Sequence, residues 1–387
     1  KDGPAIRLTQ QIFHYLANGS DQDRKWHAPI FLRACTKSGV VTRTILLSDK
    51  EQRVELADEV DWAVVNAGGH GFYRVRYGSD LIDVLKLELQ NRLSAVERFG
   101  LVNDSWAATL AGLTSLIDYM GLIELLREEG DINVWTTVIG SSHHMHRILD
   151  DEQCASLEKQ LRALLSPATA RLGWTAKEGE SELDSQLRGD LIGALGTVAE
   201  DKACQERAKE LYAQYEKDPD TVDRNLIPAL VAIVAHTGSS TEYEKFYGKF
   251  KTAQTPQEET RYLFALANFR VPKLIDRTLD LTINGEVRTQ NSPYLMRGIL
   301  LNKRARDRAW SFLKAHWDEM LRQYPDNSIP RMCEGVIGLV DAALEADVRR
   351  FFATHPVKQG AKQIEQHLER LRVAVACKER WRDWLGS

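Results

Sequence analysis

Three closely spaced histidines are the first residues of this sequence that could take part in chemistry. His143, His144 and His146 lie within residues 141–146, and His143 and His146 would share one face of a helix. A zinc site needs three or four ligands in a tetrahedral arrangement, and no carboxylate or cysteine stands at a matching spacing. The sequence also contains no H-E-x-x-H motif. We therefore expect a polar helix surface here, and no catalytic or metal-binding residues in this chain.

The sequence also lacks a recognisable nucleophile. It has no G-x-S-x-G motif and no C-x-x-C pair. The glycine-rich run Gly68-Gly-His-Gly71 resembles a phosphate loop, but it lies between two predicted strands, so a turn that needs positive φ angles explains it better. The widely spaced cysteines are typical of free thiols in a reducing compartment, and we expect a cytoplasmic protein. They are Cys35, Cys154, Cys204, Cys333 and Cys377.

Charge and hydrophobicity argue against a nucleic-acid partner and against a membrane-spanning segment. The 387 residues carry 51 Lys and Arg against 55 Asp and Glu, and this net charge of -4 argues against a nucleic-acid partner. A membrane span needs about 20 apolar residues, whereas the best apolar run, residues 226–235, is half that length and contains Pro228. The chain starts without a methionine and enters a strand-like pattern by Ile6. We therefore expect no membrane segment, and we expect a piece of a longer protein.

Residues 1–77 show the alternation that is typical of half-buried strands. Apolar residues recur at every second position around Ile6, around Val54 and from Tyr73 through Val75 to Tyr77. Glycine- and asparagine-rich turns separate these runs about every ten residues. The pattern predicts about six short strands in a small β-sandwich domain that covers residues 1–77.

Residues 78–387 change to a helical period. Short helices of about 10–18 residues are predicted, interrupted by breakers such as Gly121 and Pro167. Such a length of short helices predicts stacked helix pairs, so the expected fold class is mainly α, with a HEAT- or armadillo-like solenoid following the sandwich. The apolar faces that support it are Leu157, Leu161, Leu164 and Leu165; Trp310, Leu313, Trp317 and Tyr324; and Ile364, Leu368, Leu371 and Val375.

A series of motifs resembles the C-terminal half of one enzyme family. Trp62-Ala-Val-Val-Asn66 followed by Gly71-Phe-Tyr-Arg-Val-Arg-Tyr77 is similar to a pattern of the zinc aminopeptidases that include aminopeptidase N and the puromycin-sensitive aminopeptidase. Further matches follow in the family's order, with Glu97, Asn291 and His316 as conservative departures. They are Gln10 with Phe13, Trp26 with Pro29, Arg98 to Asp104, Arg288 with Gln290, Trp310 with Phe312 and Trp317, Phe351 with Phe352, and Gln366 with Glu369.

The resemblance implies a role without chemistry for this chain. In that family a catalytic domain precedes a β-sandwich and a helical domain, and only the last two are matched here. The G-A-M-E-N and H-E-x-x-H motifs are absent, so zinc is expected in a catalytic domain of the parent protein, where it would activate water. The implied function is the non-catalytic C-terminal part of an aminopeptidase, whose solenoid caps the active site and shapes a peptide chamber. The alternative is a stand-alone helical-repeat adaptor that binds a partner protein.

The resemblance also implies which residues touch a peptide. In the family, the R-x-Q segment and the loop after the tryptophan-containing helix line the chamber. These correspond here to Arg288 and Gln290, and to Ser328, Ile329 and Arg331. The expected partners are therefore the catalytic domain of the parent chain and a peptide substrate. For Arg288 a structural ion pair is the simpler explanation, while Arg331 is expected to be exposed.

Overall fold

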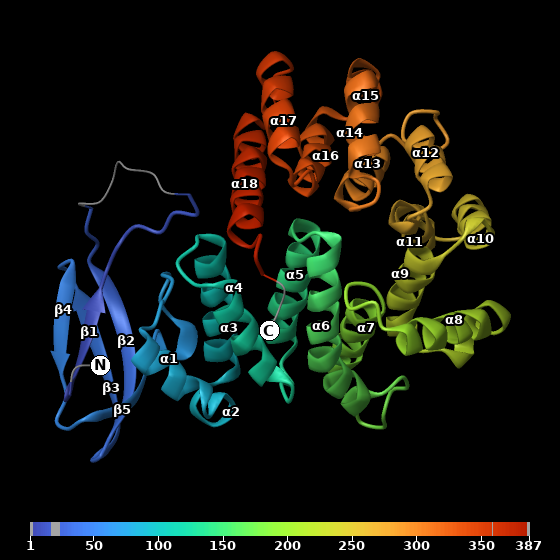
Figure 1. Cartoon of the computed structure of the whole chain (residues 1–387). Coiled ribbons are helices and arrows are strands. Elements are labelled where there is room, and N and C mark those ends of the chain that lie inside the picture. The colour runs from blue at the N-terminus through green and yellow to red at the C-terminus, as the bar shows by residue number, and fades with distance from the viewer. Residues whose placement is uncertain (1–2, 17–23, 358, 385–387) are drawn as a thin grey trace. The chain divides into compact units, whose positions relative to one another are not determined.

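The computed structural model describes residues 3–16, 24–357 and 359–384, in which strands come first and helices follow (Figure 1). The strands are β1 (Ala5–Thr9), β2 (Ala28–Thr36), β3 (Gly39–Leu47), β4 (Glu51–Glu55) and β5 (Val60–Val65). The first α-helices are α1 (Ser79–Lys86), α2 (Leu89–Arg92), α3 (Ala95–Leu110), α4 (Leu116–Ile123), α5 (Ile132–Ile148), α6 (Asp151–Leu172), α7 (Glu182–Gly196), α8 (Lys202–Lys217) and α9 (Ile227–Thr237).

The later α-helices are α10 (Ser240–Thr252), α11 (Pro256–Ala265), α12 (Pro272–Leu281), α13 (Ser292–Leu301), α14 (Arg306–Ala315), α15 (Trp317–Gln323), α16 (Ile329–Cys333), α17 (Ala342–Thr354) and α18 (Ala361–Arg380). The 3₁₀ segments are η1 (Ala67–Gly69), η2 (Glu124–Leu126), η3 (Pro219–Thr221), η4 (Arg224–Leu226), η5 (Leu266–Asn268), η6 (Asp326–Ser328) and η7 (Glu334–Gly338). The protein is therefore mainly helical, with a small sheet region near its N-terminus, as the sequence predicts.

The strands form two antiparallel sheets. One pairs β1 with β4, and the other has the order β3-β2-β5. Apolar side chains from both sheets meet in a shared core that includes Ile6 of β1, Leu32 of β2 and Ala63 of β5, together with Leu81 of α1. The alternation around Ile6 thus marks a real strand, because one of its faces is buried.

The prediction of a strand from Tyr73 to Tyr77 is wrong. This segment alternates between half-buried and exposed side chains, and Phe72 is fully exposed, but it joins no sheet. Side chains replace the strand ladder: the Tyr77 hydroxyl accepts from the Val65 N–H at 3.0 Å, and the Val75 N–H donates to Asp104 at 2.8 Å. Period-two burial alone therefore does not require backbone pairing with a neighbour.

The glycine-rich turn after β5 has the positive φ angles that the sequence predicts. Gly68 has φ 73° and Gly69 has φ 72°, values that favour glycine. Glu97 holds this turn, because its carboxylate accepts from the Gly68 N–H at 3.0 Å and from the Ser94 N–H at 2.8 Å. The same carboxylate binds Arg33 of β2 at 2.6 Å, so one side chain joins the turn, a strand and the first turn of α3.

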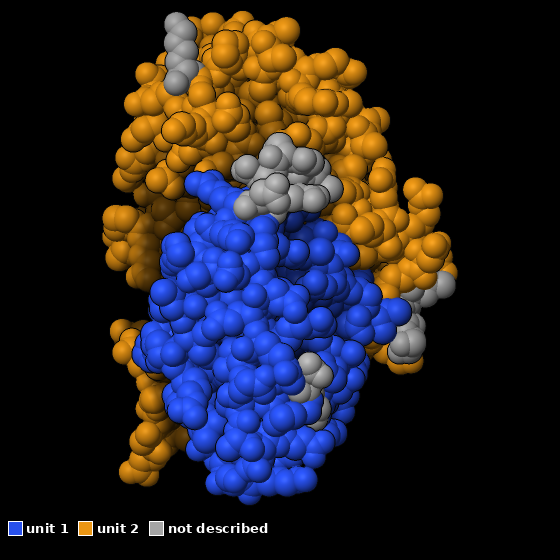
Figure 2. Space-filling model, turned by 90° about the vertical axis from the view of Figure 1, so that its left-hand side faces the viewer, with its two compact units in different colours: residues 1–141 blue, residues 142–387 orange. Residues whose placement is uncertain are grey.

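The chain divides within α5 into two compact units, which comprise residues 1–141 and residues 142–387 (Figure 2). The change from strands to α-helices falls earlier, between Val65 and Ser79. In the first unit, α1 packs on β5, and α3 packs on η1 and α4. The domain boundary expected after residue 77 stays a prediction.

Successive helices of the second unit pack against one another. α6 contacts α7, α7 contacts α9, α9 contacts α11 and α11 contacts α13, while α8 and α10 pack on α9 and α11. The later part of the unit returns to its beginning: Lys303 Nζ donates to the Leu149 carbonyl at 2.8 Å, and Gln153 Nε2 donates to the Trp381 carbonyl at 2.6 Å. The unit is thus tied by contacts between residues far apart in the sequence.

Some predicted features of the helices need correction. The face formed by Leu157, Leu161, Leu164 and Leu165 is buried as expected, but Pro167 lies inside α6 and does not end it. The buried apolar face continues past this proline to Ala168, and its packing explains why the helix continues past Pro167. Gly121 likewise lies inside α4. The face predicted for the last helix is displaced, because Leu368 and Val375 are only half-buried while Val373, Ala374 and Cys377 are buried.

Among the residues that the structure describes, none of the helices combines the length and the apolar character that crossing a membrane requires.

Candidate functional site

The five predicted peptide-contact residues fall into two groups by exposure. Gln290 is exposed, and Arg288 is 62% exposed and forms an ion pair with Glu259 at 3.0 Å. Arg331, in α16, is exposed as expected. Ser328 and Ile329 are buried, and the Ser328 hydroxyl donates to the Pro325 carbonyl at 2.6 Å. Arg288, Gln290 and Arg331 are therefore accessible at the surface, whereas Ser328 and Ile329 are not.

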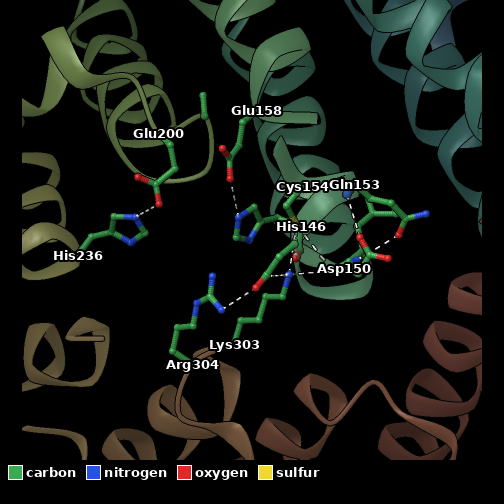
Figure 3. Close-up of polar contacts among 12 residues, drawn as sticks. His146, Asp150, Gln153, Cys154, Glu158, Glu200, His236, Lys303 and Arg304 are labelled. Carbon is green, nitrogen blue, oxygen red and sulfur yellow. Dashed lines mark hydrogen bonds and ion pairs between the residues drawn. The ribbon is translucent and has the colours of Figure 1, made fainter. Parts of the chain in front are cut away.

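A polar cluster that sequence reasoning missed surrounds Cys154 in the second unit (Figure 3). Lys303 Nζ lies 3.2 Å from the Cys154 sulfur and 3.2 Å from Asp151 Oδ1. His146 Nε2 lies 3.6 Å from Glu158 Oε1. Burial alone would lower the pKa of His146, but its neighbours Cys154 and Glu158 raise it to about 9. A protonated His146 facing Glu158 therefore joins α5 to α6.

A second cluster is centred on Glu200, which Figure 3 shows beside His236. Glu200 Oε1 lies 2.8 Å from His236 Nε2 and accepts from Arg270 at 2.6 Å, while Oε2 accepts from Gln205 at 2.9 Å. Burial favours the neutral acid, yet these partners hold the pKa of Glu200 far below its usual range. Glu200 therefore stays ionised and joins the residues after α7 to the ends of α9 and η5.

The Glu200 backbone supports this geometry. Its φ angle is 51°, in the left-handed region that non-glycine residues rarely adopt. The flanking amides close the end of α7, with the Ala199 N–H bonded to Ala194 and the Asp201 N–H bonded to Leu195. A hollow of about 450 Å³ lies beside the cluster and is lined in part by Lys202 and Lys209. The left-handed conformation of Glu200 thus places its carboxylate beside His236 at the end of α9 and Arg270 after η5.

The three histidines have different surroundings. His143 is exposed, His144 is half-buried, and His146 belongs to the Cys154 cluster. The expectation of a uniformly polar surface is therefore too simple. Within residues 3–16, 24–357 and 359–384, no three His, Cys, Asp or Glu side chains gather as they would around a metal ion. The expectation that this chain binds no metal stays a prediction.

Several contacts of both clusters cross long stretches of sequence. His236 lies 36 residues from Glu200, Arg270 lies 70 residues from it, and Lys303 lies 149 residues from Cys154. No local spacing rule could have found them. The partial signal in the sequence is the repeated placement of charged residues just after helix ends, as at Glu200, Arg270 and Lys303.

Comparison with known proteins gives a consistent result. Residues 62–373 match the family model described as the ERAP1-like C-terminal domain. The chain is 28% identical over 393 residues to aminopeptidase M1-A of Oryza sativa subsp. japonica, which covers 96% of this chain and 44% of that protein. It is 27% identical over 404 residues to aminopeptidase M1 of Arabidopsis thaliana, covering 96% of this chain and 44% of that protein.

A yeast relative gives the same picture. The chain is 26% identical over 388 residues to the mitochondrial aminopeptidase 2 of Saccharomyces cerevisiae, covering 97% of this chain and 40% of that protein. The chain therefore spans less than half the length of these curated relatives.

Proposed function

The chain belongs to the ERAP1-like C-terminal domain family, and from this membership we propose that it is the non-catalytic C-terminal part of a zinc-dependent aminopeptidase. The family resemblance predicted from the sequence motifs is thereby confirmed. The observation that carries the proposal is the match over residues 62–373, together with relatives that are aminopeptidases by name. Zinc and the water that it activates would belong to another part of the parent protein, since this sequence lacks H-E-x-x-H.

The proposed role is to cap the active site and enclose a chamber that admits peptides. In this proposal the helices form a two-layered solenoid, which is supported by the successive contacts from α6 to α13. The ion pairs at Glu200 and Lys303 would hold its helix ends in fixed positions. The partners would be the catalytic domain of the parent chain and a peptide, which would reach Arg288, Gln290 and Arg331.

We also propose a reducing compartment such as the cytoplasm. The five cysteines are free thiols, and four of them are buried. In an oxidising compartment, structural cysteines are usually paired.

Arg331 is the residue at which the peptide-contact proposal is best tested. A charge-assisted hydrogen bond from its guanidinium to a peptide oxygen would contribute about 1.5–3 kcal/mol. In the full-length parent enzyme, Arg331→Ala should therefore lower kcat/KM for peptides by about ten-fold or more. A single-residue chromogenic substrate is too short to reach α16 and should be cleaved almost as before.

The matched control is Arg224→Ala, which removes an arginine side chain that is 89% exposed and belongs to neither predicted contact segment. It should change neither rate. Equal losses on both substrates for Arg331→Ala would indicate a folding or docking defect, and no loss on either would remove Arg331 from the proposed site. The isolated chain, mixed with full-length enzyme whose catalytic site has been inactivated, should restore no peptide hydrolysis if catalysis resides wholly in the part of the parent protein outside this chain.

A further inference from the structure

A cavity of about 310 Å³ in the second unit combines several cationic side chains with an aliphatic wall. Its polar lining comes from His144 and Arg147 of α5, Arg297 of α13, Glu334 of η7 and Arg370 of α18. The remaining lining is mainly branched aliphatic. A concave site of this volume, with a few convergent polar groups, has the dimensions of a small-molecule pocket.

The charges of this cavity do not balance. Among the described residues, Glu334 is the only acidic side chain that lines the cavity; Oε2 of Glu334 lies 2.8 Å from Arg297, and Oε1 lies 3.4 Å from Arg370. Both carboxylate oxygens are thus occupied by two of the three guanidiniums. Arg147 donates from Nε to the His143 carbonyl at 3.3 Å and has no ion pair within the described part of the chain. Three cations facing one anion leave an excess of two positive charges.

The remaining groups do not remove this excess. Burial and the nearby cations Arg147 and Arg370 lower the pKa of His144 to about 3, so the imidazole is neutral at pH 7. Arg147 and Arg370 line the same cavity, and burial and the charge of Arg370 lower the pKa of Arg147 by more than Glu334 raises it. Arg147 is half-buried, so water screens it only in part. A bound anion would relieve this repulsion.

We propose that the cavity binds a phosphate group, held by Arg147 and Arg370 and flanked by the Arg297–Glu334 pair. The excess of two charges matches a dianion, and guanidinium groups bind phosphate oxygens through paired hydrogen bonds. The aliphatic wall would accommodate an apolar substituent on that phosphate. Free phosphate and a small phosphate monoester would bind the arginines in the same way, but only the monoester would also contact the aliphatic wall.

The test is calorimetric titration of the purified 387-residue chain with inorganic phosphate and with phenyl phosphate, at constant ionic strength. We expect saturable binding to one site. Arg147→Gln and Arg370→Gln should each weaken binding by ten-fold or more, while Arg207→Gln should leave it unchanged. Arg207 is a suitable control because it is paired with Glu210 on α8 and does not line the cavity.

A second variant keeps the proposal falsifiable if an arginine variant folds poorly. Glu334→Gln removes the one opposing carboxylate and should tighten phosphate binding several-fold, which a general loss of structure would not do. Tighter binding of phenyl phosphate would identify a phosphate monoester as the ligand, and equal affinities would identify free phosphate. No saturable binding to the unmodified chain, unchanged affinity in Arg147→Gln, or weaker affinity in Glu334→Gln would overturn the proposal.

Discussion

At the scale of single residues, the Tyr77 hydroxyl bonds both backbone groups of Val65, donating to the carbonyl at 3.2 Å and accepting from the N–H at 3.0 Å. Tyr77→Phe keeps the ring but leaves both groups without this partner. We expect a loss of about 1–3 kcal/mol in the free energy of unfolding, measured by urea denaturation.

The control is Tyr215→Phe, because the Tyr215 hydroxyl makes no hydrogen bond with the residues that the structure describes. Its loss should stay below about 0.5 kcal/mol. If both variants lost the same free energy, the bonds to Val65 would not stabilise the fold.

Glu129 is fully buried and paired with Arg98 through contacts of 2.6 and 2.9 Å. Burial raises its pKa, but Arg98 and the amides of Gly130 and Asp131 lower it more, so the folded-state pKa lies below the ordinary value. The stabilisation is therefore complete above the unfolded-state pKa and is lost as the pH falls through the folded-state pKa. Glu129→Gln should cost about 3–5 kcal/mol at pH 7, because it leaves Arg98 buried and unpaired.

The pH dependence separates this pair from an exposed one. The difference in unfolding free energy between the natural chain and Glu129→Gln should shrink as the pH falls below the unfolded-state pKa of a glutamate, about 4.3. Glu210→Gln, which breaks an exposed pair with Arg207, should cost less than about 1 kcal/mol at any pH. A difference for Glu129→Gln that stayed constant down to pH 3 would contradict the ionised pair.

Some residue environments could be predicted from the sequence. The positive φ angles at Gly68 and Gly69 follow from the glycine-rich turn. The exposure of Arg331 was predicted correctly, although the residue lies in α16 and not in the loop that the sequence suggested. The Cys154 and Glu200 clusters could not be predicted, because a carboxylate in the sequence does not reveal which distant cation it will meet. Burial of Ser328 in η6 and of Ile329 in α16 could not be predicted either, because it depends on tertiary packing such as that of α16 on α13 and α18.

At the scale of elements, two glycines of α7 allow α9 and the turn before it to approach closely. A Cβ added at Gly189 would lie 2.8 Å from the Asn225 carbonyl oxygen, and one at Gly196 would lie 2.5 Å from Ile233. Gly189→Ala should therefore destabilise the fold by about 1–3 kcal/mol, because the backbone of Asn225 cannot move aside without cost.

Gly248 of α10 is the matched control, since a Cβ there would meet no atom within 4 Å. Gly248→Ala should stabilise the protein by about 0.5–1 kcal/mol, because alanine favours a helix more than glycine does. Urea unfolding of both variants gives the comparison. Stabilisation in both would mean that α7 and α9 are farther apart than described.

The elements show where sequence patterns succeed and where they fail. The helical period after residue 78 predicts the class of structure correctly because buried leucines on α6 recur at helical spacing. Single breakers were less reliable: Pro167 lies within α6 because apolar residues on both sides are buried together. Tyr73 and Tyr77 alternate like strand residues, but their hydroxyls bond the backbone of β2 and β5 from outside the sheets.

At the scale of the whole molecule, the chain should have no hydrolytic activity of its own. The purified chain should bind less than stoichiometric zinc by elemental analysis and should not cleave an aminoacyl chromogenic substrate. The physical reason is that no zinc ligand set gathers among the residues that the structure describes, whereas zinc requires at least three protein ligands. One tightly held zinc per chain together with activity would contradict this and return attention to His143, His144 and His146.

Gln153 at the start of α6 bonds the Trp381 carbonyl across 228 residues of sequence. A ribosome adds about 5–20 residues per second, so tens of seconds separate the synthesis of these two partners. During that interval the polar groups of α5 and α6 are hydrated, and the surfaces that the C-terminal segment later covers stay exposed. We therefore expect this long-range contact to make the protein depend on chaperones during translation, and not to slow the folding of the finished chain.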